Sequence, residues 1–406
     1  MPILANSVNQ LFIPAAVLLL PIGVTLWFRW TVLRADEAKQ RLIWSGYRSF
    51  GRFILAVTVA AWWITWDLAG MSSFVSVVVR TWPRAIEISS AASWRFWLPP
   101  AASLGIFLIL CYGGDKTVLR LKWTTADTLR QAWWRLVSFV IPLLMVAAGF
   151  EFILDRDLSG IAWLLFAGVV SIVGTGLLRR AQGMKLQQLK SGEFRNRALR
   201  VARGMEVPLR RIYVIPAGKG HLTNAYAYGI TNAIALTDNL GKYLDGRQLE
   251  FVIAHEVAHI KLRHGRMRLL LAGTIFSIMA TTLFLLPLQM KDFRPPIQLI
   301  AIMGPLIALY YCSRRFEYSA DREAIEFTDD AEMAIRALAK LHQDLDLPAA
   351  SDAFTELFMT HPTFAHRVGA VVNNGQIPAD RLPQILEETG MSAVAARSRR
   401  EERNIS

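Results

Sequence analysis

Long apolar segments alternate with short polar ones along most of this chain. The first apolar run, residues 11–28, is long enough to cross about 30 Å of hydrocarbon as a helix. Six further runs follow at residues 53–66, 96–114, 136–150, 158–178, 269–290 and 295–313. The pattern predicts about seven transmembrane helices, of which the second and fourth are the shortest. The start lacks a cationic segment and a cleavage site, so we expect the first run to be retained.

Lysine and arginine gather in alternate connections between these runs. They are frequent at residues 29–52, 116–135 and 179–203, and sparse at 80–95, 156 and 291–294. Because basic loops stay on the cytoplasmic side, this alternation places the N-terminus outside and the C-terminus inside. The polar segment after the fifth run is therefore expected in the cytoplasm. We interpret the tryptophans near the run ends, such as Trp44, Trp62 and Trp63, as aromatic belts.

A small sheet and two helices are predicted in that polar segment. Residues 182–203 have the pattern of a basic amphipathic helix, expected near anionic headgroups. Alternating apolar positions and turns predict strands at 211–215, 223–228 and 232–237. The next helix opens with Asp245 and Gln248, three residues apart as in a capping box. Its expected buried stripe consists of Leu249, Val252, Ile253, Val257 and Ile260.

Composition agrees with a membrane protein. Of the 406 residues, 53% are hydrophobic and 13 are Trp, which is too apolar for a soluble chain of this length. The formal charge of +13 is spread over several loops, so topology accounts for it and no nucleic-acid partner is expected. Cys111 and Cys312 both lie in apolar runs, which argues against a disulfide framework or a thiolate metal site. Any metal would be held by histidine and carboxylate.

The capped helix carries His255, Glu256 and His259 in the pattern H-E-x-x-H. Histidines four residues apart lie on one helix face, so both imidazoles can reach a single metal ion. Glu256, one step round the helix, points at the water molecule that such an ion holds. Two surface histidines beside a helical carboxylate are the plain alternative. The pattern predicts a zinc site with one ion per chain.

A catalytic zinc site takes three protein ligands and keeps one position open for water. Glu317 and Asp321 stand four residues apart in a helical segment just after the seventh apolar run. That spacing lets Glu317 be the third ligand while Asp321 accepts a hydrogen bond from a ligating imidazole. In the alternative, both carboxylates pair with Arg314, Arg322 or neighbouring residues on a solvated helix face.

Four separated signatures occur in the order of one known family. They are Asn224-Ala225-Tyr226-Ala227, H-E-x-x-H at 255–259, Glu317-x-x-x-Asp321, and His361-Pro362-Thr363 to Arg367. With them the chain resembles the integral-membrane gluzincin peptidases, which include the CAAX prenyl proteases and the HtpX-type heat-shock membrane proteases. The resemblance covers roughly residues 205–370. It implies a mainly α-helical polytopic membrane protein with a small α+β, zincin-like catalytic domain.

The resemblance also implies roles for the matching residues. His255, His259 and Glu317 would bind zinc. Glu256 would be the general base that takes a proton from the attacking water, and Asp321 would orient a ligating histidine.

Residues outside the metal group would bind the substrate and stabilise the oxyanion. The segment Asn224–Ala227 would be an edge strand that pairs with an extended substrate. His361 and Arg367 would lie near the reacting carbonyl and stabilise the oxyanion. Thr363 departs from the family, which often has a second proline there. The remaining histidines are interpreted as structural: His264, His342 and His366.

These observations predict a membrane-embedded zinc endopeptidase that cleaves membrane-associated or misfolded proteins at the cytoplasmic face. CAAX-type processing of lipidated C-terminal peptides is one alternative, and a non-catalytic transporter or scaffold is another. Apart from Asp67, which directly follows the second run, the runs hold almost no ionisable residue, which disfavours a transporter. The expected location is a bacterial inner membrane. The expected partners are the lipid bilayer and a protein or peptide substrate, and the oligomeric state stays open.

Five segments follow from these predictions. They are an N-terminal membrane region (1–180), the first part of the catalytic domain (181–267), two further spans (268–313), the second part of the catalytic domain (314–395) and a disordered tail (396–406). The outer segment 71–97 is interpreted either as an interfacial segment or as a small cap.

Overall fold

The computed structural model describes residues 2–68, 94–118, 120–181, 186–216, 223–286, 294–344, 356–378 and 380–391. These residues belong to two compact units. Unit 1 consists of Met1–Gln182 and Ala272–Ala308, and unit 2 consists of Gly183–Leu271 and Leu309–Ser406. The predicted tail lies outside the described residues, as does the segment 71–97 apart from its last four residues.

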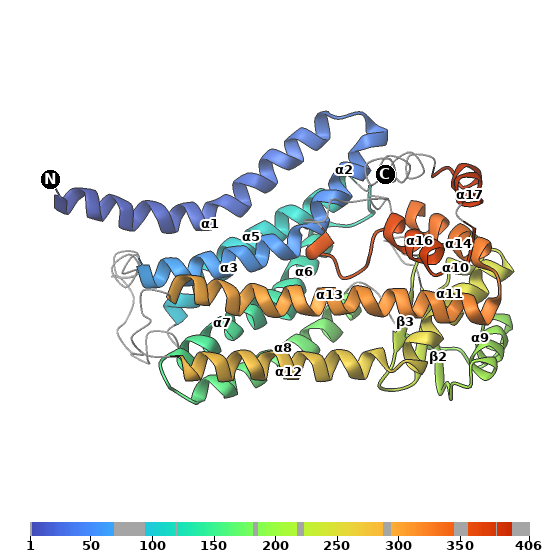
Figure 1. Ribbon diagram of the computed structural model, residues 1–406. Coiled ribbons are helices and arrows are strands. Elements are labelled where there is room, and N and C mark those ends of the chain that lie inside the picture. Colours follow the sequence, from blue (N-terminus) through green and yellow to red (C-terminus); the bar gives the residue numbers. More distant parts are fainter. Residues whose placement is uncertain are drawn as a thin grey trace. The chain divides into compact units, whose positions relative to one another are not determined.

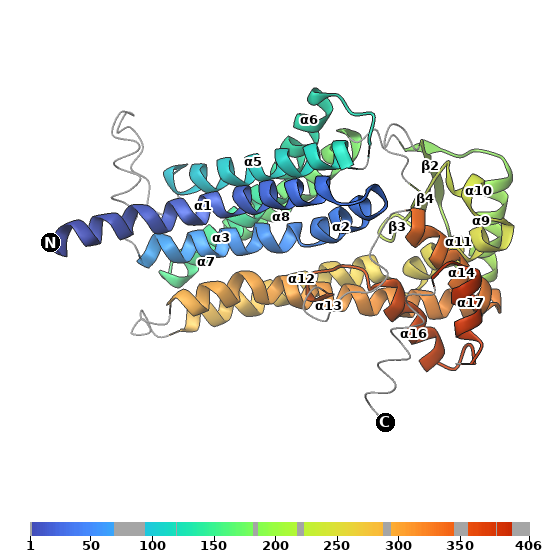
Figure 2. The ribbon, with the colours of Figure 1, turned by 90° about the horizontal axis from the view of Figure 1, so that it is seen from above.

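Unit 1 is a bundle of long apolar helices (Figures 1 and 2). Within it α5 packs against α1, α3 and α6, and α8 packs against α6 and α7. The elements are α1 (Pro2–Arg34), α2 (Glu37–Ser49), α3 (Gly51–Leu68), α5 (Trp94–Val118), α6 (Thr125–Arg135), the π-helical turn η1 (Leu136–Val140), α7 (Ile141–Leu154) and α8 (Ser159–Ala181). Two more helices contribute residues to both units: α12 (His264–Leu285) and α13 (Arg294–Thr328).

Six described helices are long and apolar enough to cross a membrane. They cover Phe12–Arg34, Leu98–Val118, Thr125–Leu154, Ser159–Leu178, His264–Leu285 and Pro296–Thr328, and a shorter apolar helix covers Phe53–Thr65. This confirms the prediction of a polytopic membrane protein with about seven helices. The predicted run at 136–150 is only part of a longer stretch, because α6 continues through η1 into α7 without a break.

Three tryptophans that we interpreted as belt residues belong to the core of unit 1. Trp44, Trp62 and Trp63 are at most 1% exposed. The indole N–H groups of Trp44 and Trp63 donate hydrogen bonds to Asp115 and Glu151 at 2.8 and 2.7 Å. These carboxylates lie near the ends of α5 and α7, so the span helices hold more ionisable groups than the sequence indicated. Both are paired inside the bundle, as carboxylates in a membrane must be.

Unit 2 carries a four-stranded sheet in the order β1-β2-β4-β3. Strand β1 pairs antiparallel with β2, β2 pairs parallel with β4, and β4 pairs antiparallel with β3, which is therefore an edge strand. Helix α11 packs against β3, α9 and α14. The elements are β1 (Gln187–Gln188), α9 (Glu193–Gly204), β2 (Arg211–Ile215), β3 (Ala225–Tyr228), β4 (Ala233–Thr237), α10 (Leu240–Tyr243), α11 (Gly246–Lys261), α14 (Ala331–Asp344), α16 (Phe364–Asn373) and α17 (Leu382–Glu388).

The three predicted strands are confirmed, but the helix predicted at 182–203 is wrong in its first half. Strand β1 occupies 187–188, and α9 begins only at Glu193. Between them Gly192 has φ 106°, a left-handed conformation that favours glycine and ends the strand before the helix can start. The apolar face of α9 is buried in the core of unit 2: Ala198, Val201 and Ala202.

Helix α11 begins at the predicted capping box. Oδ1 of Asp245 accepts hydrogen bonds from the N–H groups of Arg247 and Gln248 at 3.0 and 2.9 Å. The side chain of Gln248 accepts one from the N–H of Asp245 at 3.3 Å, so three backbone donors at the start of the helix are satisfied. The whole predicted stripe is buried: Leu249, Val252, Ile253, Val257 and Ile260. The helix is thereby fixed in the core, and so are the side chains it carries.

Candidate active site

Helix α11 presents two histidine rings on one buried face. His255 and His259 are each 8% exposed, and their ring centroids lie 4.8 Å apart. Their Nε2 atoms approach to 3.2 Å. The spacing of four residues along the helix therefore brings two ligand atoms to one point.

Glu317 of α13 adds a carboxylate to this pair. Its Oε1 lies 3.5 Å from Nε2 of His259, and its Oε2 lies 3.6 Å from Nε2 of His255. Ligand atoms about 2.0–2.1 Å from a tetrahedral zinc ion are separated by roughly 3.4 Å, which matches these three separations. Within the described part of the chain, these are the only three His, Cys, Asp or Glu side chains grouped closely enough to hold a metal ion.

Asp321 lies one turn further along α13. Its Oδ1 is 2.9 Å from Nδ1 of His255, the ring nitrogen that faces away from Glu317. Arg367 of α16 donates hydrogen bonds from Nε and Nη2 to the two oxygens of Asp321. The pairing with Arg314 or Arg322 considered from the sequence is not what the geometry shows. The arginine beside Asp321 comes from a helix that is distant in sequence.

His361 lies at the exposed rim of the cluster. Its Nδ1 is 3.1 Å from Oε2 of Glu317, and its side chain is 68% exposed. The segment that carries it is fixed by Arg314, whose Nη1 donates to the carbonyls of Glu356 and Met359 at 2.7 and 2.9 Å. Arg314 therefore holds the backbone beside the site.

Thr363 caps the helix that carries Arg367. Its hydroxyl accepts a hydrogen bond from the N–H of His366 at 3.4 Å, at the start of α16. Its own N–H donates to Oε1 of Glu356 at 3.3 Å. A threonine at this position, in place of a second proline, therefore supplies an N-cap.

Three further residues belong to the cluster, although sequence reasoning did not place them there. Nδ1 of His264 lies 2.8 Å from Nδ1 of His259, and its Nε2 lies 3.2 Å from Oγ of Ser319. Nη2 of Arg268 lies 3.5 Å from Oε1 of Glu317. From the sequence alone, His264 is interpreted as structural. The one feature of the sequence that could indicate the place of His264 is its position five residues after the H-E-x-x-H pattern.

Burial changes the acid–base properties of Glu256 and His259 on α11. It raises the pKa of the Glu256 carboxyl to about 7, and the charge of Glu317 acts in the same direction. Burial also holds the pKa of His259 well below its usual range, and the neighbouring His255 adds to this effect. A neutral imidazole is the form that binds a metal. A carboxyl with a pKa near 7 can both take up and return a proton at neutral pH.

The predicted substrate segment lies at the sheet edge. The carbonyl of Asn224 accepts a hydrogen bond from the N–H of Thr237 at 3.0 Å, and its N–H donates to Oγ1 of Thr237 at 2.9 Å. Hydrogen-bonded pairs alternate along antiparallel strands. Tyr226 therefore turns its backbone groups toward β4, whereas Ala225 and Ala227 turn theirs toward the open edge. The side chain of Asn224 accepts from the N–H of Ala225 at 2.9 Å.

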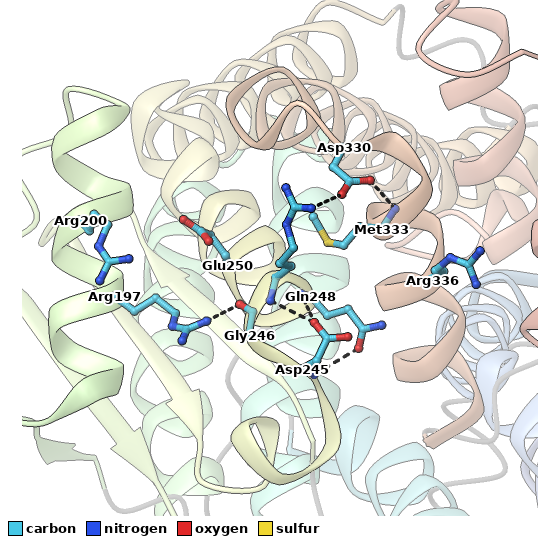
Figure 3. A pocket seen from close by; sticks show the side chains of 10 residues that line it. Arg197, Arg200, Asp245, Gly246, Gln248, Glu250, Asp330, Met333 and Arg336 are labelled. Atoms are coloured by element: carbon cyan, nitrogen blue, oxygen red, sulfur yellow. Dashed lines mark hydrogen bonds and ion pairs between the residues drawn. The ribbon is translucent and has the colours of Figure 1, made fainter.

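A separate pocket lies at the amino end of α11 (Figure 3). It is roughly 20 Å along the helix from His259, at 1.5 Å per residue. Two of its arginines make contacts within the fold: Arg197 donates to the carbonyl of Gly246, and Arg247 lies 3.3 Å from Asp330. The lining consists of Arg197, Arg200, Asp245, Gly246, Arg247, Gln248, Glu250, Asp330, Met333 and Arg336. We connect this pocket with no chemistry.

Comparison with known proteins relates the chain to a peptidase family. Residues 188–374 match the model of peptidase family M48. The chain is 30% identical over 203 residues to the protease HtpX homolog of Methanocaldococcus jannaschii, covering 42% of this chain and 70% of the relative. The homolog from Lactobacillus helveticus is 23% identical over 282 residues, covering 62% and 94%. The crystal structure of Ste24p from S. mikatae has a similar fold, with a TM-score of 0.52, 17% identity and coverage of 88% and 98%.

Proposed function

The chain belongs to peptidase family M48, and from that premise we propose that it is a zinc-dependent endopeptidase acting on membrane-associated or misfolded proteins at the cytoplasmic face. The chain is an integral membrane protein of a metalloprotease family. The observation that carries the proposal is the convergence of three donors. Nitrogen and oxygen atoms of His255, His259 and Glu317 lie 3.2, 3.5 and 3.6 Å apart, as one zinc ion requires.

Each group near this triad has a chemical task. Zinc bound by His255, His259 and Glu317 would supply a Lewis acid that polarises the scissile carbonyl and acidifies water. Glu256, whose carboxyl has its pKa raised to about 7 by burial, accepts a proton from the attacking water. It then delivers that proton to the nitrogen of the leaving amine. The two transfers leave Glu256 in its starting state.

Residues around the triad orient it and receive the substrate. Asp321 lies 2.9 Å from Nδ1 of His255, which keeps the Nε2 lone pair directed at the donor group. Arg367 holds Asp321 in place. His361, exposed and next to Glu317, can donate to the carbonyl oxygen of the substrate as negative charge develops there.

The edge strand β3 suits an extended peptide of almost any sequence. Ala227 turns its N–H and carbonyl groups outward, so a substrate strand can pair with them through its own backbone. Recognition of this kind uses hydrogen bonds to the main chain of the substrate and depends little on its side chains. It therefore fits misfolded or partly unfolded proteins as the substrate class.

The expected side of the membrane rests on the charge pattern of the connections. The basic connections at 29–52, 116–135 and 179–203 favour the cytoplasm, and most of the last one belongs to unit 2. We propose a bacterial inner membrane as the location, in keeping with the bacterial source of several relatives. Thr231→Cys, at an exposed turn of unit 2, tests this orientation. An impermeant maleimide should label this cysteine only after the cells are opened. Labelling in intact cells would show that unit 2 lies on the opposite side of the membrane.

Metal analysis of the purified full-length protein tests the activity. Wild type should contain about one zinc per chain and cleave an unfolded protein, whereas Glu256→Gln should retain zinc and lose cleavage. Glu250→Gln, on the same helix but outside the cluster, is the matched control and should cleave like wild type. A wild type that bound no zinc and cut no substrate would overturn the proposal. Cleavage of a prenylated peptide alone would favour CAAX-type processing.

A further inference from the structure

His264 lies against the second histidine of the donor group. It opens α12, directly after the two residues that follow the end of α11 at Lys261. Nδ1 of His264 is 2.8 Å from Nδ1 of His259, and the two rings meet edge to face at 73°. His264 is only 4% exposed. A buried imidazole at this distance shares one hydrogen with its neighbour.

The direction of that hydrogen bond follows from the atoms around it. His259 directs Nε2 toward His255 and Glu317, so its own hydrogen must be on Nδ1. His264 must then accept with the lone pair of its Nδ1 and carry its hydrogen on Nε2. Nε2 of His264 lies 3.2 Å from Oγ of Ser319, which accepts that hydrogen.

The serine hydroxyl has an acceptor of its own. Oγ of Ser319 can donate to the carbonyl of Phe316 at 3.0 Å or to that of Arg315 at 3.2 Å, both within α13. Each atom from His259 to the α13 backbone thus has a fixed donor or acceptor role, and the assignment leaves His264 neutral. Phe316 also stacks on the His264 ring, with centroids 4.6 Å apart and planes at 18°. The orientation of the ring is therefore held from its face as well as from both nitrogens.

We propose that His264 is a positioning residue for His259: a neutral imidazole that accepts the Nδ1 hydrogen and so directs Nε2 of His259 at the metal. It does for His259 what the carboxylate of Asp321 does for His255. The difference lies in charge, because His264 adds no negative charge to a group that already contains Glu317. The inference rests on the proposed metal site, and its test separates the two.

The test measures zinc affinity of full-length variants by competition with a chelating dye. His264→Leu removes the acceptor, and we expect affinity to fall about 10- to 100-fold. His264→Asn can place an oxygen near the former Nδ1 and should retain affinity within about threefold. Ser319→Ala removes the second acceptor and should cause an intermediate loss. His342→Leu, a histidine of α14 that contacts Phe364, is the matched control and should bind like wild type.

The spectrum of the cobalt-substituted protein gives a second readout. The visible bands should shift in His264→Leu and stay in place in His264→Asn and His342→Leu, because only the first releases the His259 ring. Equal zinc affinity and unchanged bands in His264→Leu would overturn the inference, as would equal losses in the Leu and Asn variants. If His264→Leu fails to fold, the zinc affinities of Ser319→Ala and His264→Asn decide whether the inference holds. Absence of zinc from wild type would instead contradict the proposed function.

Discussion

Arg367 and Asp321 are joined by two parallel hydrogen bonds, one of them from Nε to Oδ2 at 2.7 Å. Oδ1 of the same carboxylate lies 2.9 Å from Nδ1 of His255. Asp321 is 3% exposed, so these two partners, and almost no water, surround its carboxylate. A residue of α16 is thereby connected through α13 to a candidate metal ligand on α11.

We predict that Arg367→Lys weakens both zinc binding and catalysis. Lysine keeps the charge but cannot donate two parallel hydrogen bonds to a carboxylate, so Asp321 loses its fixed orientation. Zinc affinity and kcat/KM should each fall about 10- to 100-fold. Arg367→Met should also lower the free energy of unfolding by about 3–5 kcal/mol, because it leaves a buried carboxylate unpaired. Dye competition, steady-state kinetics and thermal unfolding measure these effects.

Arg381→Lys is the matched control for this prediction. Arg381 donates to Glu332 from Nε at 2.7 Å and from Nη2 at 3.2 Å, with the same bidentate geometry but on the surface. Its variant should bind zinc and cleave substrate like wild type. Wild-type zinc affinity in Arg367→Lys would show that the contact to Asp321 does not orient His255.

A second prediction concerns the backbone beside His361. Arg314→Met removes the two hydrogen bonds to the carbonyls of Glu356 and Met359 and releases the segment that carries His361. A shift of about 1 Å in a catalytic group can lower the reaction rate about 100-fold, so we expect kcat to fall roughly 10- to 100-fold. Zinc content should stay at the wild-type level. The neighbouring Arg315→Met, at an exposed position, should keep its activity; equal losses in both variants would exclude this anchoring role.

The edge strand yields a third prediction. Ala227→Pro removes one outward N–H from β3 without touching a hydrogen bond to β4, and proline is tolerated on edge strands. Loss of one main-chain hydrogen bond to the substrate should raise KM about 3- to 10-fold and leave kcat nearly unchanged. Ala227→Ser keeps the N–H and should behave like wild type. An unchanged KM in Ala227→Pro would show that substrates do not pair with this strand.

Local patterns were sufficient to predict the parts of the site that depend on helical spacing. His255 and His259, like Glu317 and Asp321, stand four residues apart, and such pairs share a helix face wherever the helix lies. The capping box at Asp245 is also local, and it is present. The helix predicted from 182 is wrong because the turn dipeptide Ser191-Gly192 outweighs the amphipathic pattern.

The position of His264 could not be predicted from spacing. On an uninterrupted helix a residue five positions after His259 would point about 140° away from it. The chain instead breaks at Arg263, which has φ 55°, and the start of α12 returns His264 to His259. A positive φ at arginine has no signature in the sequence. The contact of Arg367 with Asp321 likewise depends on tertiary packing of α16, 46 residues away along the chain.

A last prediction concerns the helix packing of unit 1. Gly114 of α5 lies against the fully buried ring of Trp44, and a Cβ at this position would overlap the ring atoms Cζ2 and Cη2. Trp44 has little freedom to move away, because its indole N–H donates to Asp115 at 2.8 Å. Gly114→Ala should therefore lower the free energy of unfolding by about 1–3 kcal/mol, the usual effect of overpacking.

Gly105→Ala lies on the same helix, and its Cβ would meet no atom within 4 Å. The control should match or slightly exceed wild-type stability, since alanine favours a helix more than glycine does. Thermal unfolding in detergent micelles measures both variants, and equal melting temperatures would show that α5 does not pack against Trp44 at this glycine.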